Sequence, residues 1–273
     1  MRQLVVLLAA AAFTGCTSTV LTEPVIHVSP YLALYQLRGD TKMQSQGTLP
    51  SDIVNNPRQP LRRFGQDRFR EDVGVRVDIG DGFGGLRGEY YKLDMNTSRS
   101  NELQADWGRL LAGDFASIYA EMDELRVGYV EPFADIRTKY RDEDLRLQFG
   151  AGGVFATREM DMRGRESTNT RTQNLKLDGD IVYIAVRARA TWMDFSLDLD
   201  YAIAPESFVI GGDMEDLSQD FEARFSYQLP QRDIQLFAGV RYSEFSASGI
   251  ANGFRYDTDL VVDGFQFGAL VTF

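Results

Sequence analysis

The chain has 273 residues, of which 44% are apolar, 12% aromatic and 25% charged. This composition is sufficient for one sizeable core and excludes intrinsic disorder, collagen and a disulfide-rich scaffold. Because 29 Lys plus Arg stand against 40 Asp plus Glu, the net charge of −11 excludes the basic surface that nucleic-acid binding requires. One His and one Cys leave too few ligands for a Cys/His metal site. We therefore expect no nucleic-acid partner, no metal and no cofactor.

The N-terminus carries the pattern of an export signal. A basic start precedes a nine-residue apolar run over 4–12, which is too short to cross a bilayer. Small residues directly before Cys16 resemble the lipobox of bacterial lipoproteins, although Phe13 stands where Leu is usual. The resemblance implies a signal peptide over 1–15, lipidation of Cys16 and a lipidated tether over 16–28. Ordinary cleavage near the end of the apolar run is the alternative, and both readings export the chain.

From Asp72 onward, short stretches alternate apolar and polar residues between clusters of Gly, Asp, Asn and Pro. The segment 193–203 shows this best, because every odd position is apolar and most even positions are acidic or hydroxylated. Such stretches have about the length of strands that cross a membrane. The pattern predicts ten strands, near 29–37, 70–80, 85–95, 121–132, 143–157, 179–191, 194–204, 218–229, 234–245 and 258–273. Eight strands remain possible, because 31–37 alternates poorly.

The segments between these strands alternate long and short along the whole chain, from the long 38–69 to the long 246–257. Outer-membrane barrels have short turns on the periplasmic side and longer loops outside. The alternation therefore predicts an all-β fold: an antiparallel up-and-down transmembrane β-barrel over 29–273, with both ends on the short-turn side.

The last strand ends on an aromatic residue, Phe273, with apolar residues at alternate positions before it. This strand resembles the assembly signal of the Gram-negative outer-membrane β-barrel superfamily, and the strand pattern over 70–273 resembles the same superfamily without indicating a particular member. The resemblance implies a location in the cell outer membrane, contact with outer-membrane lipid, and recognition of Phe273 by the barrel-assembly machinery. It implies no particular surface ligand.

Three hairpins place opposite charges across from each other on the polar face of the strands. A symmetric loop over 80–85 and a centred turn in each of the other two hairpins give the four pairs Asp78 with Arg87, Arg76 with Glu89, Glu222 with Arg241, and Arg187 with Asp198. A barrel of eight to ten strands is narrow, so long Arg side chains paired with carboxylates would fill it. These pairs predict a largely plugged lumen, and a solvated charged face is the alternative.

Two long segments carry predictions of their own. The segment 38–69 concentrates the arginines Arg58, Arg62, Arg63, Arg68 and Arg70, which either bind an anionic lipid headgroup or pair with nearby acids. The segment 101–112 has Leu103, Trp107, Leu110 and Leu111 at helical spacing. That spacing predicts a short amphipathic helix that packs on the barrel rim.

Catalysis is not expected, because the only histidine is His27 and the topology places it on the periplasmic side. We therefore expect an outer-membrane barrel with a structural or surface-interaction role. A small porin-like channel or transporter is the first alternative. A soluble periplasmic β-barrel lipoprotein that binds an apolar ligand is the second, and it requires the apolar face to point inward.

Overall fold

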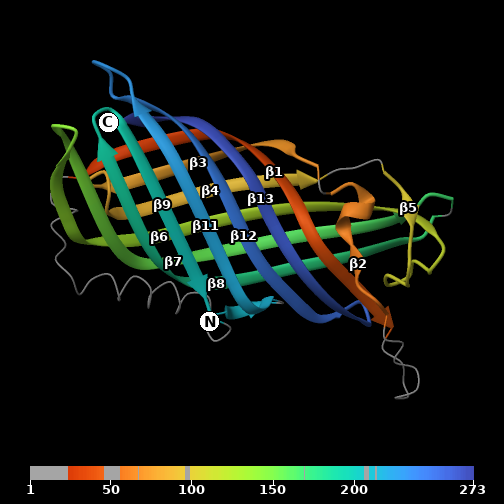
Figure 1. The fold of residues 1–273 in the computed structure, drawn as a ribbon. Helices are drawn as coiled ribbons and strands as arrows, with labels where there is room; N and C mark the ends of the chain where they lie inside the picture. Colours follow the sequence, from red (N-terminus) through yellow and green to blue (C-terminus); the bar gives the residue numbers. More distant parts are fainter. Residues whose placement is uncertain are drawn as a thin grey trace.

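The computed structural model describes residues 24–45, 56–66, 68–95, 99–168, 170–205, 209–212 and 214–273 (Figure 1). The expected signal peptide, Cys16 and most of the expected tether lie outside the described residues. Ten long strands form the wall: β1 (Val25–Ser45), β3 (Arg70–Gly80), β4 (Gly85–Met95), β6 (Phe115–Tyr140), β7 (Glu143–Glu166), β8 (Thr172–Trp192), β9 (Phe195–Ala204), β11 (Met214–Gln228), β12 (Ile234–Ala251) and β13 (Phe254–Thr272). The short elements are β2 (Gln59–Pro60), the 3-10 helix η3 (Leu61–Phe64), β5 (Asn101–Glu102) and β10 (Val209–Gly212). Within the described residues, no helix is long and apolar enough to cross a membrane.

The ten long strands close into one antiparallel ring. Each long strand pairs with the next one along the chain, and β13 pairs back to β1. Closure allows the backbone groups of a sheet to hydrogen-bond within the barrel, as they must where lipid surrounds it. The predicted fold class and its ten strands are confirmed.

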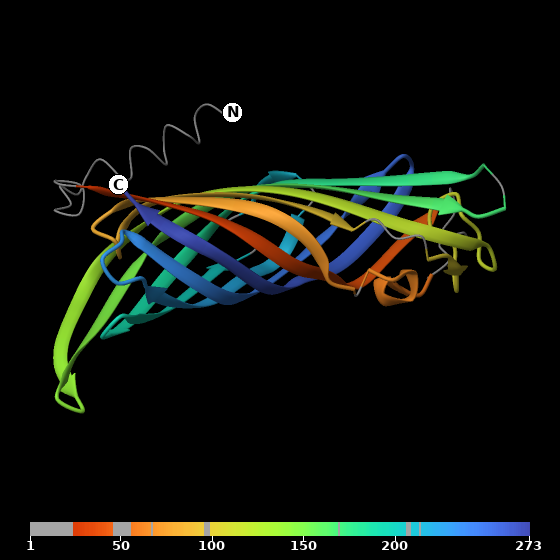
Figure 2. The same ribbon diagram turned by 90° about the horizontal axis from the view of Figure 1, so that it is seen from above.

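The start of β1 and the C-terminus lie together at one end of the barrel (Figure 2). The backbone N–H of Phe273 donates to the carbonyl of Ile26 at 2.9 Å. The short connections 81–84, 141–142, 193–194 and 229–233 lie at this end as well. We call it the turn end, and the opposite end, which carries the long segments, the loop end.

The strands change polarity at one level along the barrel. On the turn side of this level, the outer face of β6 is apolar at Leu125, which is 52% exposed, and the inner face carries the buried Glu124. One rung towards the loop end, Asp123 lies on the outer face and Met122 is buried inside. The outer face therefore becomes charged where the inner face becomes apolar.

The other strands invert in the same way. On β7, Arg158 lies opposite Glu124 and Met160 lies opposite Met122. Inside the barrel, polar side chains give way to apolar ones from Tyr183 to Ile181 on β8, from Ser243 to Phe245 on β12 and from Tyr35 to Leu37 on β1. On the outer face, apolar or aromatic side chains give way to polar ones in the same direction, towards the loop end. This change occurs from Val182 to Asp180 on β8, from Tyr242 to Glu244 on β12 and from Leu34 to Gln36 on β1.

This inversion divides the barrel into a turn-end half and a loop-end half. On β8, the apolar outer face runs from Val182 to Trp192, about 11 residues. At about 3.3 Å per residue and a tilt of about 45°, such a strand rises about 25 Å, the height of the apolar band on membrane barrels. The turn-end half is therefore the membrane-spanning part. The loop-end half has the charged exterior and apolar interior of a soluble barrel.

The expected long segments 158–178 and 246–257 were wrong, because strands occupy most of them. β7 continues to Glu166, β8 begins at Thr172, and a tight turn at Asn252 and Gly253 joins β12 to β13. Most apolar residues of β7 stand at odd positions up to Phe155, whereas those from Met160 onward stand at even positions. This change of phase resembles the end of a strand in the sequence, although the strand itself continues.

The loop-end half encloses an apolar core of its own, which we call the apolar chamber. The strands β3 and β4 have only 11 residues each, whereas β6 has 26, so the wall is short between β1 and β6. The segments 56–66 and 99–114 fill this place, and they pair with β1 and β6 through β2 and β5. Leu61, Phe64, Trp107 and Leu110 of these segments are fully buried. Residues from six of the ten long wall strands complete the chamber: Leu37, Met43, Leu93, Met95, Ile118, Met122, Met160, Met162, Leu177 and Leu260.

The helix expected over 101–112 is absent from the structure. β5 begins the segment, and a tight turn follows in which the backbone N–H of Trp107 donates to the carbonyl of Leu110 at 2.9 Å. Leu103, Trp107 and Leu110 are buried through this turn, because the barrel mouth offers them a deeper surface than a helix face would, whereas Leu111 is 46% exposed. Packing at the rim was predicted correctly: the indole N–H of Trp107 donates to the hydroxyl of Thr41 at 3.3 Å.

The inversion predicts opposite effects for one substitution at two positions on the outer face of β8. Val186→Arg places a charge in the middle of the lipid-facing band and should lower the free energy of unfolding by about 2–4 kcal/mol. Asp178→Arg, on the same face but in the loop-end half, should change it by less than about 1 kcal/mol. Denaturant unfolding of the two variants in lipid vesicles measures both values, and equal losses would contradict the division into halves.

Candidate functional site

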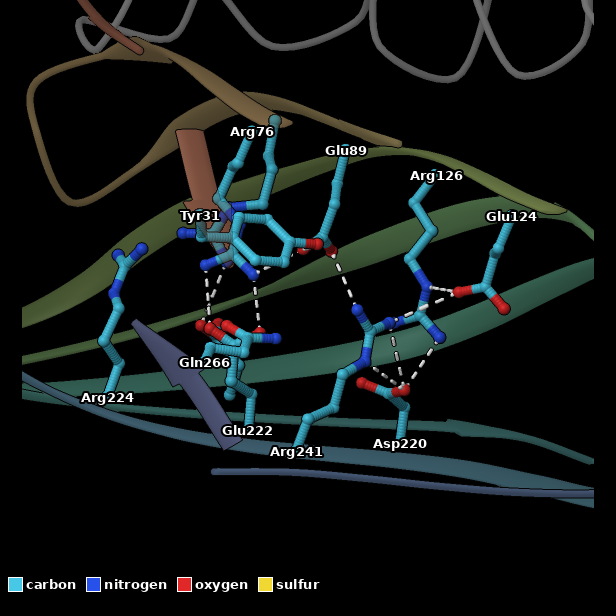
Figure 3. Close-up of polar contacts among 12 residues, drawn as sticks. Tyr31, Arg76, Glu89, Glu124, Arg126, Asp220, Glu222, Arg224, Arg241 and Gln266 are labelled. Atoms are coloured by element: carbon cyan, nitrogen blue, oxygen red, sulfur yellow. Dashed lines mark hydrogen bonds and ion pairs between the residues drawn. The ribbon is translucent and has the colours of Figure 1, made fainter. Parts of the chain in front are cut away.

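The lumen of the turn-end half is filled by charged side chains from nearly every strand of the wall (Figure 3). Because side chains alternate between the two faces of a strand, the polar positions of the lipid-facing segments all point inward. Among the described residues, eight arginines meet seven carboxylates there: Arg76, Arg87, Arg126, Arg158, Arg187, Arg189, Arg224 and Arg241, with Asp78, Glu89, Glu124, Asp198, Asp200, Asp220 and Glu222. All the cations are arginines, whose planar forks can bind two or more acceptors at once.

The layer nearest the apolar chamber centres on Glu124, which is fully buried. Arg126, Arg158 and Arg241 all donate to its carboxylate. Arg126 also donates to Asp220 at 2.8 Å. These contacts join β6, β7, β11 and β12 across the lumen, so this layer links opposite walls of the barrel.

The middle layer centres on Arg76, which is 2% exposed. Its guanidinium donates to Glu89 on the neighbouring β4 at 2.8 Å and to Glu222 on the distant β11 at 2.5 Å. The hydroxyl of Tyr31 donates to the same Glu89 at 2.9 Å. Arg76 and Glu89 are opposite in the register, as predicted.

Glu222 lies opposite Arg241 in the register, as predicted, but the two side chains have different partners. Glu222 reaches across the lumen to Arg76, while Arg241 contacts Glu89 at 3.4 Å and Asp220 at 3.3 Å. Long side chains in a narrow barrel reach the far wall, and register alone does not determine their partners.

The layer nearest the turn end contains the third predicted hairpin, and its register differs from the prediction by two residues. Trp192 pairs with Phe195, so Arg187 lies opposite Asp200, and Arg189 opposite Asp198. The corresponding ion pairs measure 2.6 and 2.5 Å. The turn consists of Met193 and Asp194, and Met193 has a positive φ of 53°. The shift of two residues keeps the acids on the inner face but exchanges their partners.

A loop closes the turn end of the lumen. In this cap loop, residues 81–84, the carboxylate of Asp81 accepts hydrogen bonds from the backbone N–H groups of Phe83 and Gly84 at 2.9 and 2.6 Å. Arg187 donates to the carbonyl of Phe83 at 2.7 Å, and Arg189 donates to the carbonyl of Gly82 at 2.5 Å. Phe83 is 2% exposed. The same arginines that bind acids in the lumen therefore hold the cap loop over it.

The packing leaves a cavity of about 50 Å³ beside the charged layers. Small residues of the wall give it room, among them Gly128, Ala185 and Ala202. At about 10–15 Å³ for each water centre, this space holds a few waters. Among the residues the structure describes, no group of His, Cys, Asp or Glu side chains has the arrangement of a metal site.

Of the other residues that the sequence singled out, Phe273 lies away from this network, whereas His27 pairs with Asp78 in the register and lies beside the cap loop. Phe273 is 77% exposed at the turn-end rim, and His27 accepts or donates a hydrogen bond of 3.0 Å to the hydroxyl of Thr272. Sequence reasoning missed Glu124, Arg126 and Arg158. The first two alternate on a predicted strand and could have been found, whereas Arg158 lies in a segment that was assigned to a loop.

The basic segment near the loop end is partly neutralised. Arg58 donates to Asp257 at 2.6 Å and also contacts Asp259. Lys42 contacts Asp257 at 3.2 Å. Partial burial raises the pKa of Asp257, but the hydrogen bonds from Arg58 and Lys42 outweigh burial, so this pKa lies below its ordinary value.

Comparisons with known proteins agree with the fold. No protein-family model matches the sequence, and no curated protein matches it. The outer-membrane protease OmpT from Escherichia coli is similar in structure, with a TM-score of 0.50, 11% identity, and coverage of 94% of this chain and 99% of that one. Ail of Yersinia pestis has a TM-score of 0.30, 8% identity, and coverage of 88% and 98%. The Pseudomonas putida toluene transporter TodX has a TM-score of 0.28, 9% identity, and coverage of 89% of both chains. The first likeness shows that the fold is that of an outer-membrane β-barrel.

Arg187→Ala should lower the free energy of unfolding by about 3–5 kcal/mol, because it leaves Asp200 with fewer charge partners in the lumen and releases the cap loop. Arg163 pairs with Asp161 on the exposed face of the loop-end half, so Arg163→Ala should cost less than about 1 kcal/mol. Denaturant unfolding measures both, and similar values would indicate that the lumen charges are solvated.

Acid should weaken the Arg58–Asp257 contact. The folded pKa of Asp257 lies below the unfolded value of about 3.9. The contribution of this carboxylate to folding stability is therefore complete above about pH 3.9 and is lost as the pH falls through the folded pKa. Wild type should therefore lose more stability between about pH 5 and pH 2 than Arg58→Gln does, by less than about 1 kcal/mol because the pair is partly exposed. Identical acid profiles would refute this assignment.

Proposed function

We propose that this protein is a closed, non-conducting outer-membrane barrel that holds its loop-end half at the cell surface as a rigid platform for structural or surface interactions. The observation that carries the proposal is the polarity inversion, because it extends a folded barrel with a core of its own beyond the membrane. The proposed role is non-catalytic. The proposal includes a lipid anchor at Cys16 and recognition of Phe273 during assembly.

Closure of the lumen is supported at three levels. The apolar chamber and the buried segments 56–66 and 99–114 fill the loop-end half. Three layers of ion pairs cross the turn-end half, and the cap loop covers its end. A hydrated ion would have to displace both an apolar core and buried charge pairs, which favours the platform over the porin-like alternative.

Rigidity of the loop-end half is supported by its strands. β6, β7 and β8 continue far past the inversion level with regular pairing, such as Met160 with Leu177. Their outer faces carry Asp123, Glu159 and Lys176, which suit contact with water or with polar partners. The loop-end half has the inward apolar face that the soluble-barrel alternative requires. The lipid-facing band of the turn-end half disfavours that alternative for the whole chain.

Single-channel recording in planar bilayers tests the proposal. Purified, refolded barrel should give no stepwise conductance under conditions in which an open porin conducts. Folding is checked on the same sample by faster migration of the unheated band in gel electrophoresis. Regular ohmic steps from a correctly folded sample would overturn the closed-barrel proposal and favour a channel.

A further inference from the structure

Arg224 is the one lumen arginine whose described contacts include no close carboxylate. Its side chain is 3% exposed, and its nearest acid, Asp198, lies 3.9 Å away. Its Nε and Nη1 atoms are buried and have no hydrogen-bond partner. In Figure 3 its guanidinium stands apart from the dashed contacts that join the other arginines to acids. Its other contact is with the ring of Phe237, at 5.0 Å.

The neighbouring acids are already engaged. Asp198 binds Arg189 at 2.5 Å, and Glu222 binds Arg76 at the same distance. Asp200 is shared between Arg87 and Arg187, at 3.0 and 2.6 Å. Turning any of these carboxylates towards Arg224 would take an acceptor away from another lumen arginine.

The net charge of the described lumen residues agrees with the lack of a free carboxylate for Arg224. Eight arginines face seven carboxylates, so the lumen carries one positive charge in excess. Arg76 and Arg87 repel Arg224, while Asp198 and Glu222 attract it. An isolated buried cation is costly, and guanidinium N–H groups without acceptors add to that cost.

We propose that the lumen binds one small monovalent anion, of halide size, at the Nε and Nη1 atoms of Arg224. A single negative charge neutralises the one excess positive charge of the lumen, whereas a divalent oxyanion would leave the lumen with a net negative charge. Two further buried donors of the lumen lack an acceptor: the Nε of Arg76, and the hydroxyl of Ser29, which pairs with Arg76 in the register. The ion is taken up as the barrel folds, and it completes the turn-end layer.

Refolding the full chain in bromide and in gluconate at equal ionic strength tests this. The temperature at which the compact, unheated gel band disappears should be a few degrees higher in bromide, because an ion that binds only the folded state stabilises it. Arg224→Met removes the excess charge and keeps the side-chain bulk, so this variant should show no difference between the two salts. Arg232→Met, in the exposed turn between β11 and β12, serves as the matched control and should respond as wild type does.

Diffraction from wild-type crystals grown in bromide provides a second measurement that does not depend on a variant folding. The proposal predicts one anomalous peak within hydrogen-bond distance, about 3.5 Å, of Arg224 Nε or Nη1. Bromide found only at exposed arginines, or water in place of the peak, would overturn the proposal. So would a salt effect that persists in Arg224→Met.

Discussion

The surroundings of the barrel change along its axis, and the sequence of each strand follows that change. Lipid cannot solvate charges, so the outer face of the turn-end half is apolar, and the polar residues of the same strands face inward. Beyond the inversion level the outer face meets water, and the apolar residues move inside, as Met122 and Met160 show. One wall thereby joins a membrane barrel to a soluble barrel without a break in its hydrogen-bond ladders.

The two interiors that result are filled by different physical means. Apolar side chains close the loop-end half, including those of the segments beside the short strands β3 and β4. In the turn-end half, arginines fill the lumen because each can bind acids on more than one strand, as Arg76 does with Glu89 and Glu222. Buried ion pairs contribute little net stability, but the loss of one partner is costly. The network therefore specifies which strands face each other across the lumen.

Period-two alternation was enough to predict the ten strands, because it depends only on local pattern. The transmembrane barrel and the inward direction of the charges also needed the long and short connecting segments and the terminal strand. The strand ends at the loop end were missed, since the apolar residues of β7 change phase between Phe155 and Met160. The contact between Arg76 and Glu222 was missed for another reason. It joins residues 146 positions apart, and only closure of the ring brings them together. The contacts of the cap loop and the weak pairing of Arg224 also follow from closure and have no signal in the sequence.

Site-directed spin labels along the outer face of β8 test the central claim most directly. Labels at Ile184 and Val186 should be accessible to oxygen dissolved in lipid and protected from a water-soluble relaxation agent. Labels at Lys176 and Asp178 should show the reverse, with the crossover between Val182 and Asp180. Water accessibility at all four positions would mean that the chain is a soluble barrel. Lipid accessibility at all four would contradict the inversion of polarity.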